Sequence, residues 1–94
     1  MDCSAVRFTR HAFERMFERS VAPEAVMRII KEGEIIASYP DDRPFPSLLI
    51  LGFEREEPLH LVVARDPANS ICFVVTVYRP DPTLWSEDFK TRKP

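Results

Sequence analysis

Two stretches near the start of the chain have the spacing of apolar residues that is typical of helices. From Thr9, a residue type that caps helix N-termini, to about Arg19, apolar residues recur at intervals of three and four. We expect these positions to form one buried stripe, and they are Ala12, Phe13, Met16 and Phe17. A second helix is predicted from Pro23, which suits a first helical turn, to a stop at Gly33.

From Glu34 onward the apolar residues form short runs bounded by turns, which is typical of β-strands. The runs are Ile35–Tyr39, Leu48–Leu51, Leu59–Val63 and Ile71–Tyr78. The segments between them are too short for crossover helices, so successive strands should pair antiparallel. We expect one last helical turn within Thr83–Phe89. The pattern predicts an α+β domain, in the order ααββββ, with two N-terminal helices on a four-stranded antiparallel sheet.

Alternation within the last two strands predicts which side chains share a face of the sheet. Placing the apolar residues together buries Leu61, Val63, Phe73 and Val75. The other face then carries His60 opposite Thr76, with Tyr78 and Cys72 on the same side. On this polar patch His60 and Tyr78 can act as acid or base, Thr76 can bind a phosphate, and Arg79 can stabilise charge. An ordinary solvent-exposed sheet face is the alternative interpretation.

The first predicted helix carries a second candidate group. His11, Arg15 and Arg19 follow one another at i, i+4 and i+8, so they form one ridge that we expect to be partly sheltered beside the apolar stripe. Arginine stays charged while histidine titrates near neutrality, so this ridge can bind a phosphate and exchange a proton. The alternative is a solvated helix face on which Glu14 and Glu18 pair with the arginines.

Length and composition limit the remaining possibilities. A chain of 94 residues has room for one domain spanning residues 1–94, and its small core makes a homodimer a candidate assembly. The net charge of −2 argues against binding nucleic acid through bulk positive charge but leaves room for a local basic patch.

No metal and no cofactor are predicted, because the Cys and His residues lack ligand spacing and no Gly-rich phosphate loop occurs. We interpret Cys3 and Cys72 as reduced thiols. The start of the chain lacks the apolar core of a signal peptide, and no stretch is apolar enough to span a membrane. We therefore expect a cytoplasmic protein.

Several linked motifs in this chain resemble the small bacterial family called domain of unknown function 4258. They are Phe8 to Met16, Gly33 to Ile36, Tyr39 to Pro44, Leu59 to Val63 and Thr76 to Pro82. Members of that family look like toxins of toxin–antitoxin pairs, encoded beside a small zinc-finger antitoxin, with a layout similar to RelE-like and barnase-like ribonucleases. The resemblance implies a toxin that cleaves RNA without a metal ion.

Transferred onto this sequence, the resemblance implies roles for particular residues. It points to His11, His60 and Tyr78 as catalytic groups that exchange protons with the ribose 2′-hydroxyl and the leaving 5′-oxygen. It points to Arg15, Thr76 and Arg79 for substrate binding, and Arg19 joins this set from the ridge on the first predicted helix. The competing hypothesis is a non-catalytic interaction module, in which an exposed sheet face or edge strand binds a protein partner.

Overall fold

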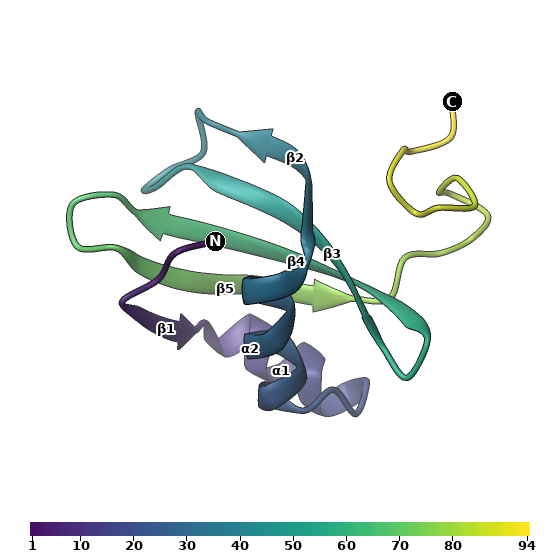
Figure 1. Cartoon of the computed structure of the whole chain (residues 1–94), viewed down its shortest axis with the longest axis horizontal. Helices are drawn as coiled ribbons and strands as arrows, with labels where there is room; N and C mark the ends of the chain where they lie inside the picture. Colours follow the sequence, from purple (N-terminus) through teal and green to yellow (C-terminus); the bar gives the residue numbers. More distant parts are fainter.

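A computed structural model describes all 94 residues, in the element order β1–α1–α2–β2–β3–β4–β5 (Figure 1). The elements are β1 (Ala5–Phe8), α1 (Arg10–Glu18), α2 (Pro23–Glu32), β2 (Glu34–Tyr39), β3 (Ser47–Glu54), β4 (Glu57–Asp66) and β5 (Ile71–Tyr78). Both predicted helices and all four predicted strands are present. Thr9 caps α1 by accepting a hydrogen bond from the Ala12 N–H, and Gly33 follows the end of α2.

The sheet has five strands in the order β1–β5–β4–β3–β2, so the prediction of a four-stranded antiparallel sheet is wrong. The four predicted strands do pair antiparallel, but β1 adds a fifth that runs parallel to β5. β1 is only four residues long and pairs with residues far along the chain, so no local pattern marks it. The α+β class is confirmed.

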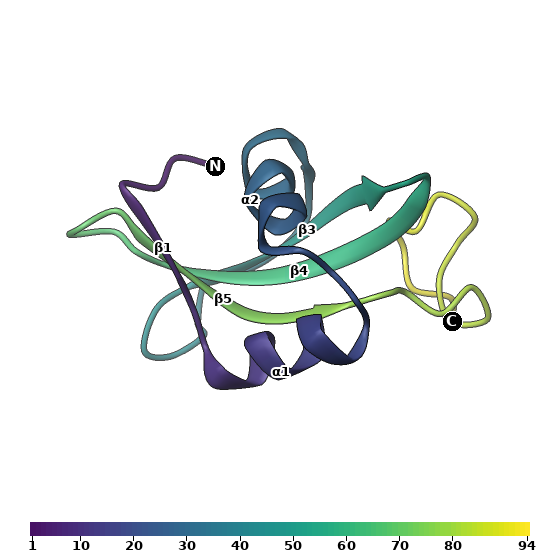
Figure 2. The same cartoon turned by 90° about the horizontal axis from the view of Figure 1, so that it is seen from below.

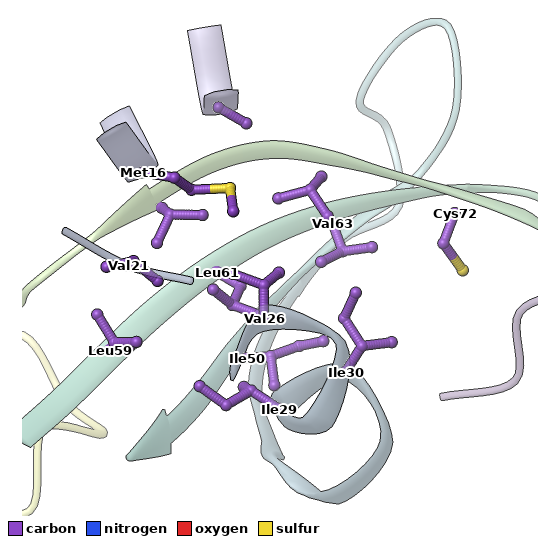
Figure 3. Close-up of a cluster of buried hydrophobic side chains, with 13 residues drawn as sticks. Met16, Val21, Val26, Ile29, Ile30, Ile50, Leu59, Leu61, Val63 and Cys72 are labelled. Atoms are coloured by element: carbon purple, nitrogen blue, oxygen red, sulfur yellow. The ribbon is translucent and has the colours of Figure 1, made fainter. Parts of the chain in front are cut away.

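Both helices lie against the same face of the sheet, α1 beside β5 and α2 beside β3 (Figure 2). We call this the helix face, and the side chains of Ile50, Leu61 and Val63 lie on it. The hydrophobic core between the layers is shown in Figure 3. Its members are Ala12, Met16, Val21, Val26, Ile29, Ile30, Ile50, Leu59, Leu61, Val63, Cys72, Val74 and Val77.

Only half of the apolar stripe predicted for α1 is buried. Ala12 and Met16 enter the core, whereas Phe13 and Phe17 are 61% and 85% exposed. Positions four apart lie on one line of a helix, and the line one residue further on is turned by about 100°. The narrow contact of α1 with the sheet therefore buries the first line and leaves the second in solvent, where Phe13 and Phe8 meet edge to face.

A β-bulge in β5 changes the side-chain parity expected for that strand. Tyr78 lies opposite His60 and Thr76 lies opposite Val62, so the predicted pairing of His60 with Thr76 is wrong. Asp66 rather than Arg65 lies opposite Ile71, and the register shifts once more between Val62 and Val63 of β4. Cys72 and Val74 are consequently buried on the helix face, while Phe73 is only partly buried and Val75 is 36% exposed. The predicted burial of Phe73 and Val75 and the placement of Cys72 on the polar face are wrong, because one extra residue inverts the alternation.

Residues 80–94 contain no helix, and the predicted helical turn is reduced to a single hydrogen-bonded turn that ends at Trp85, where the N–H groups of Leu84 and Trp85 both donate to the Asp81 carbonyl. The segment instead makes a series of turns closed by a bridge between Trp85 and Arg92. We call it the C-terminal cap. Its Pro80 and Trp85 are buried although most of the segment is exposed. These two residues anchor it to the sheet.

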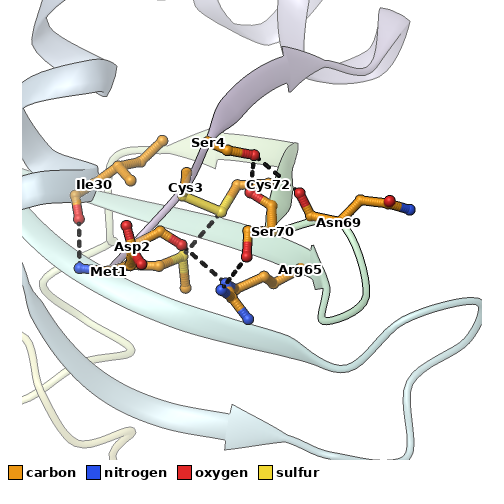
Figure 4. The surroundings of a disulfide bond; sticks show 9 residues. All are labelled: Met1, Asp2, Cys3, Ser4, Ile30, Arg65, Asn69, Ser70 and Cys72. Carbon is orange, nitrogen blue, oxygen red and sulfur yellow. Dashed lines mark hydrogen bonds between the residues drawn. A yellow bond between two sulfur atoms is a disulfide. The ribbon is translucent and has the colours of Figure 1, made fainter.

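Cys3 and Cys72 form a disulfide, which corrects their interpretation as reduced thiols (Figure 4). The bond joins the segment before β1 to β5. Arg65 donates hydrogen bonds to the Asp2 carbonyl and the Ser70 hydroxyl beside it. No helix of the structure is long and apolar enough to cross a bilayer.

Candidate active site on the second sheet face

The face of the sheet opposite the helices carries a buried histidine. We call this the second face; it includes Leu49, Leu51, His60 and Val62, which alternate with the core residues of β3 and β4. His60 has no exposed surface. Its Nδ1 lies 3.0 Å from the Tyr78 hydroxyl, and its Nε2 lies 2.8 Å from the Phe89 carbonyl oxygen.

These two contacts determine where the proton of neutral His60 resides. A carbonyl oxygen can only accept, so Nε2 carries the hydrogen and donates it to Phe89. Nδ1 is therefore an acceptor, and the Tyr78 hydroxyl donates to it. The result is a polarised pair in which Tyr78 is already hydrogen-bonded to a base.

The C-terminal cap encloses this pair. The Trp85 ring meets the His60 ring edge to face, with centroids 4.5 Å apart at 88°. The Tyr78 ring lies 5.2 Å from His60 at 75°. Trp85 and the Phe89 carbonyl thus exclude water from the imidazole, while Tyr78 keeps part of its surface exposed.

Burial shifts the protonation of both groups toward their neutral forms. It lowers the pKa of His60 below its ordinary value, and the Phe89 carbonyl opposes this by stabilising the protonated ring. Burial raises the pKa of Tyr78; the nearby Tyr39 adds to the rise and the charge of Arg92 reduces it. At pH 7 the phenol and the imidazole are both neutral, as a proton relay requires.

Two further predicted residues lie on or beside this face. Thr76 shares the face with His60 and Tyr78, as predicted, but it pairs with Val62 and not with His60. Arg79 follows directly but contacts two carboxylates, with nitrogens 3.5 Å from Glu54 and 2.9 Å from Glu57. Its positive charge is therefore largely balanced within the protein.

The other predicted group lies on the helix face and does not meet His60. His11 of α1 and Arg19, which directly follows the helix, are exposed, so the expected shelter beside the apolar stripe is absent for them. Arg15 lies 2.6 Å from Glu18, as in the alternative interpretation of a solvated helix face. The structure therefore separates His11 from the His60–Tyr78 pair by the thickness of the sheet.

A groove on the second face is lined by residues that the sequence pattern did not mark as site residues. It has a volume of about 350 Å³ and lies between the β2–β3 loop and the strands β4 and β5. Arg43 and Asp42 line it together with apolar side chains. Stiff prolines around these two charges were the only signal in the sequence, and the approach of the loop to β5 is a long-range contact. No three His, Cys, Asp or Glu side chains cluster in a way that could hold a metal ion.

Residues 8–79 match the family described as domain of unknown function (DUF4258), which is more than half of the chain. The chain belongs to the DUF4258 family. No curated protein and no solved structure matches it. The match to DUF4258 includes His60 and Tyr78 and ends at Arg79, so the C-terminal cap that encloses His60 lies outside the matched region.

Proposed function

We propose that this DUF4258 chain is an endoribonuclease that needs no metal ion and acts as the toxin of a bacterial toxin–antitoxin pair. The observation that carries the proposal is the hydrogen bond from the Tyr78 hydroxyl to Nδ1 of a buried, neutral His60. RNA supplies its own nucleophile in the ribose 2′-hydroxyl, so cleavage needs only proton transfer and stabilisation of a charged phosphorane.

The relay accounts for each proton in the reaction. The 2′-hydroxyl gives its proton to the Tyr78 oxygen while Tyr78 passes its own proton to His60 Nδ1. The 2′-oxygen then bonds to phosphorus, the bond from phosphorus to the 5′-oxygen breaks, and the proton returns through Tyr78 to that leaving oxygen. The products are a 2′,3′-cyclic phosphate and a 5′-hydroxyl. The imidazolium formed in between keeps its Nε2–H on the Phe89 carbonyl.

A cation is also needed near the phosphate, and Arg92 meets this need better than Arg79. The charge of Arg92 is close enough to Tyr78 to oppose the rise in the pKa of its phenol, which burial causes. Arg79 is held by Glu54 and Glu57. Thr76, on the same face, is placed to bind a phosphate oxygen with its hydroxyl.

Tyr78→Phe tests the proposal, since it keeps the aromatic ring and removes only the hydroxyl. We expect cleavage of total RNA by the purified chain to fall roughly 10²- to 10⁴-fold, the usual contribution of a positioned acid or base. Circular dichroism and thermal unfolding establish that the variant is folded. His11→Ala is the matched control and should cleave normally. Full activity of folded Tyr78→Phe would refute the relay, and loss of activity in folded His11→Ala would move the site to α1.

The toxin role is tested in cells by inducing expression with and without the neighbouring gene. We expect growth arrest by the chain alone and rescue when a small zinc-finger protein is encoded beside it. A cytoplasmic location belongs to this proposal, because its RNA substrates lie there. Growth that continues after induction of soluble, folded protein would contradict the toxin role.

Protein binding by α1 is a second candidate function, favoured by the exposure of Phe13 and Phe17 on one line of the helix. Large aromatic side chains in solvent are typical of protein interfaces. The partner to test first is a second copy of the chain, by sedimentation velocity over a range of concentrations. Phe17→Glu should abolish self-association, whereas Met27→Glu on the exposed side of α2 should not. A wild-type chain that sediments as a monomer throughout would exclude the homodimer.

A further inference from the structure

The groove on the second face has walls suited to a flat aromatic ligand. Its lining is mainly apolar and comes from Val62, Ala64, Phe73 and Val75 of the strands and Pro44 and Phe45 of the β2–β3 loop. Phe45 and Phe73 stack with ring centroids 5.8 Å apart and planes within 8° of parallel. Both rings are partly exposed. Aromatic side chains of this kind form stacking platforms for nucleobases in proteins that bind single-stranded RNA.

The polar groups of the groove are few and are oriented by the protein. The Ser47 hydroxyl, in a residue only 2% exposed, donates to one oxygen of the Asp42 carboxylate. This hydrogen bond holds the carboxylate at the rim and leaves its second oxygen, together with one lone pair of the first, free to accept two adjacent donors. The Thr9 hydroxyl, also in the lining, is occupied with the Val75 carbonyl and the Ala12 N–H.

Arg43 provides an unneutralised cation at the same groove. Its side chain is exposed, and it takes part in none of the five ion pairs of the structure. A guanidinium in this position can bind a phosphate through two parallel hydrogen bonds. The groove thus offers a binding partner for each part of a nucleotide. The apolar wall suits the face of the base, the fixed carboxylate suits the edge of the base, and the free guanidinium suits the phosphate.

We infer that this groove binds a guanine nucleotide and is the base-recognition subsite of the proposed ribonuclease, on whose function the inference rests. A carboxylate only accepts hydrogen bonds, so it prefers a base edge that presents two adjacent donors. Guanine presents N1–H and N2–H side by side. Adenine and cytosine pair one donor with one acceptor, and uracil has a single donor between two carbonyls. Asp42 therefore selects guanine, and Arg43 contacts its phosphate.

Binding of free nucleotides to the full chain tests the subsite independently of cleavage. Isothermal titration with guanosine monophosphate, adenosine monophosphate and inorganic phosphate gives the three affinities. We expect guanosine monophosphate to bind at least tenfold more tightly than the other two. Asp42→Asn should remove the preference for guanine, and its neighbour Asp41→Asn should retain it.

The arginine is tested with and without a phosphate on the ligand. Arg43→Ala should lower the affinity for guanosine monophosphate about tenfold and leave the affinity for guanosine unchanged. Arg55 is an exposed arginine in the β3–β4 turn, and Arg55→Ala should change neither affinity. Equal affinity for the two nucleotides, or an affinity for inorganic phosphate alone equal to that for guanosine monophosphate, would overturn the inference.

The two proposals fail separately. Cleavage without guanine binding refutes the subsite and leaves the ribonuclease standing. Selective guanine binding by a chain that never cleaves RNA refutes the ribonuclease and leaves the subsite as a nucleotide-binding site.

Discussion

His60 and Ser47 are the two buried polar residues of the domain, and each holds a different segment onto the second face. His60 bonds the C-terminal cap through the Phe89 carbonyl, and Ser47 bonds the β2–β3 loop through Asp42. A buried polar group is costly unless it is hydrogen-bonded, so each segment must stay in place for its partner to remain satisfied. These two side chains therefore determine where the C-terminal cap and the β2–β3 loop lie on the second face.

The lowered pKa of His60 predicts how stability depends on pH. The unfolded chain takes up a proton near pH 6.5, the ordinary value, but the folded chain does so only at a lower pH. Between these values the unfolded state binds more protons, so the stabilisation is complete above about pH 6.5 and is lost as the pH falls below it. The slope reaches at most about 1.4 kcal/mol per pH unit for one proton.

Urea unfolding at intervals from pH 7.5 to 5 measures this effect. His60→Gln should flatten the dependence, and His11→Gln should preserve it. The carboxylates of Asp66, Asp81 and Asp88 have pKa values lowered from 3.8 by hydrogen bonds, so they stay ionised throughout this range. A slope that survives in His60→Gln would assign the proton to another group.

Among the elements, α2 and β3 pack at the closest distance that their side chains allow. A Cβ atom added at Gly52 would lie 2.5 Å from two side-chain carbons of Ile29. Gly33, where α2 passes into β2, is equally crowded, and there the nearest atom is the backbone oxygen of Ile29. Glycine at these positions lets the helix approach the sheet.

Gly52→Ala should therefore lower the free energy of unfolding by roughly 1–3 kcal/mol, the usual cost of overpacking. Ile29→Ala alone should also destabilise by leaving a cavity. The double variant should lose less stability than the sum of the two single-variant losses, since alanine at position 29 makes room for the methyl group at position 52. Chemical denaturation of the four proteins gives this cycle, and strict additivity would show that Gly52 and Ile29 do not meet.

The elements also show how far the sequence alone could reach. Periodicity located both helices and four strands, because each is long enough for its buried side chains to repeat in a regular way. It missed β1, whose four residues become a strand only by pairing with Ile71–Val74. It placed His60 and Tyr78 on one face correctly, yet it misplaced Phe73, Val75 and Cys72, since an extra residue in a strand has no sequence signature.

The candidate site was predictable only in part for the same reason. His60, Thr76 and Tyr78 belong to paired strands, so alternation brought them together. Trp85, Phe89 and Arg43 reach the second face through long-range packing of irregular segments, which no local pattern describes. His11 shared a chemical rationale with His60 but lies on the other side of the sheet.

At the scale of the whole molecule, a core of 13 buried residues is supplemented by a covalent link. Cys3 and Cys72 are 69 residues apart in sequence, so their bond closes most of the chain into a loop. Such a loop restricts the unfolded chain, and the chain-entropy estimate for this length is about 4 kcal/mol. For a small domain this is a large fraction of the total stability.

Reduction should accordingly lower the urea midpoint of the wild-type chain markedly. The double variant Cys3→Ala, Cys72→Ala should already have a low midpoint and should not respond to the reductant. An unchanged midpoint for the wild-type chain would show that the link adds no stability. Disulfides are rare in cytosolic proteins. Labelling the free thiols of this chain in acid-quenched cells would therefore show whether Cys3 and Cys72 are reduced or bonded to each other in the cytoplasm.

Trp85 is the only tryptophan of the chain, and its ring packs edge to face against the ring of His60. An indole emits at shorter wavelength when it is shielded from water, and a protonated imidazole in contact with it quenches the emission. The intrinsic fluorescence of this protein therefore comes from one position, at the cap. Lifting of the cap would shift the emission to the red, and protonation of His60 beneath a closed cap would dim it without a shift. The fluorescence of Trp85 therefore reports whether the C-terminal cap covers the Tyr78–His60 pair.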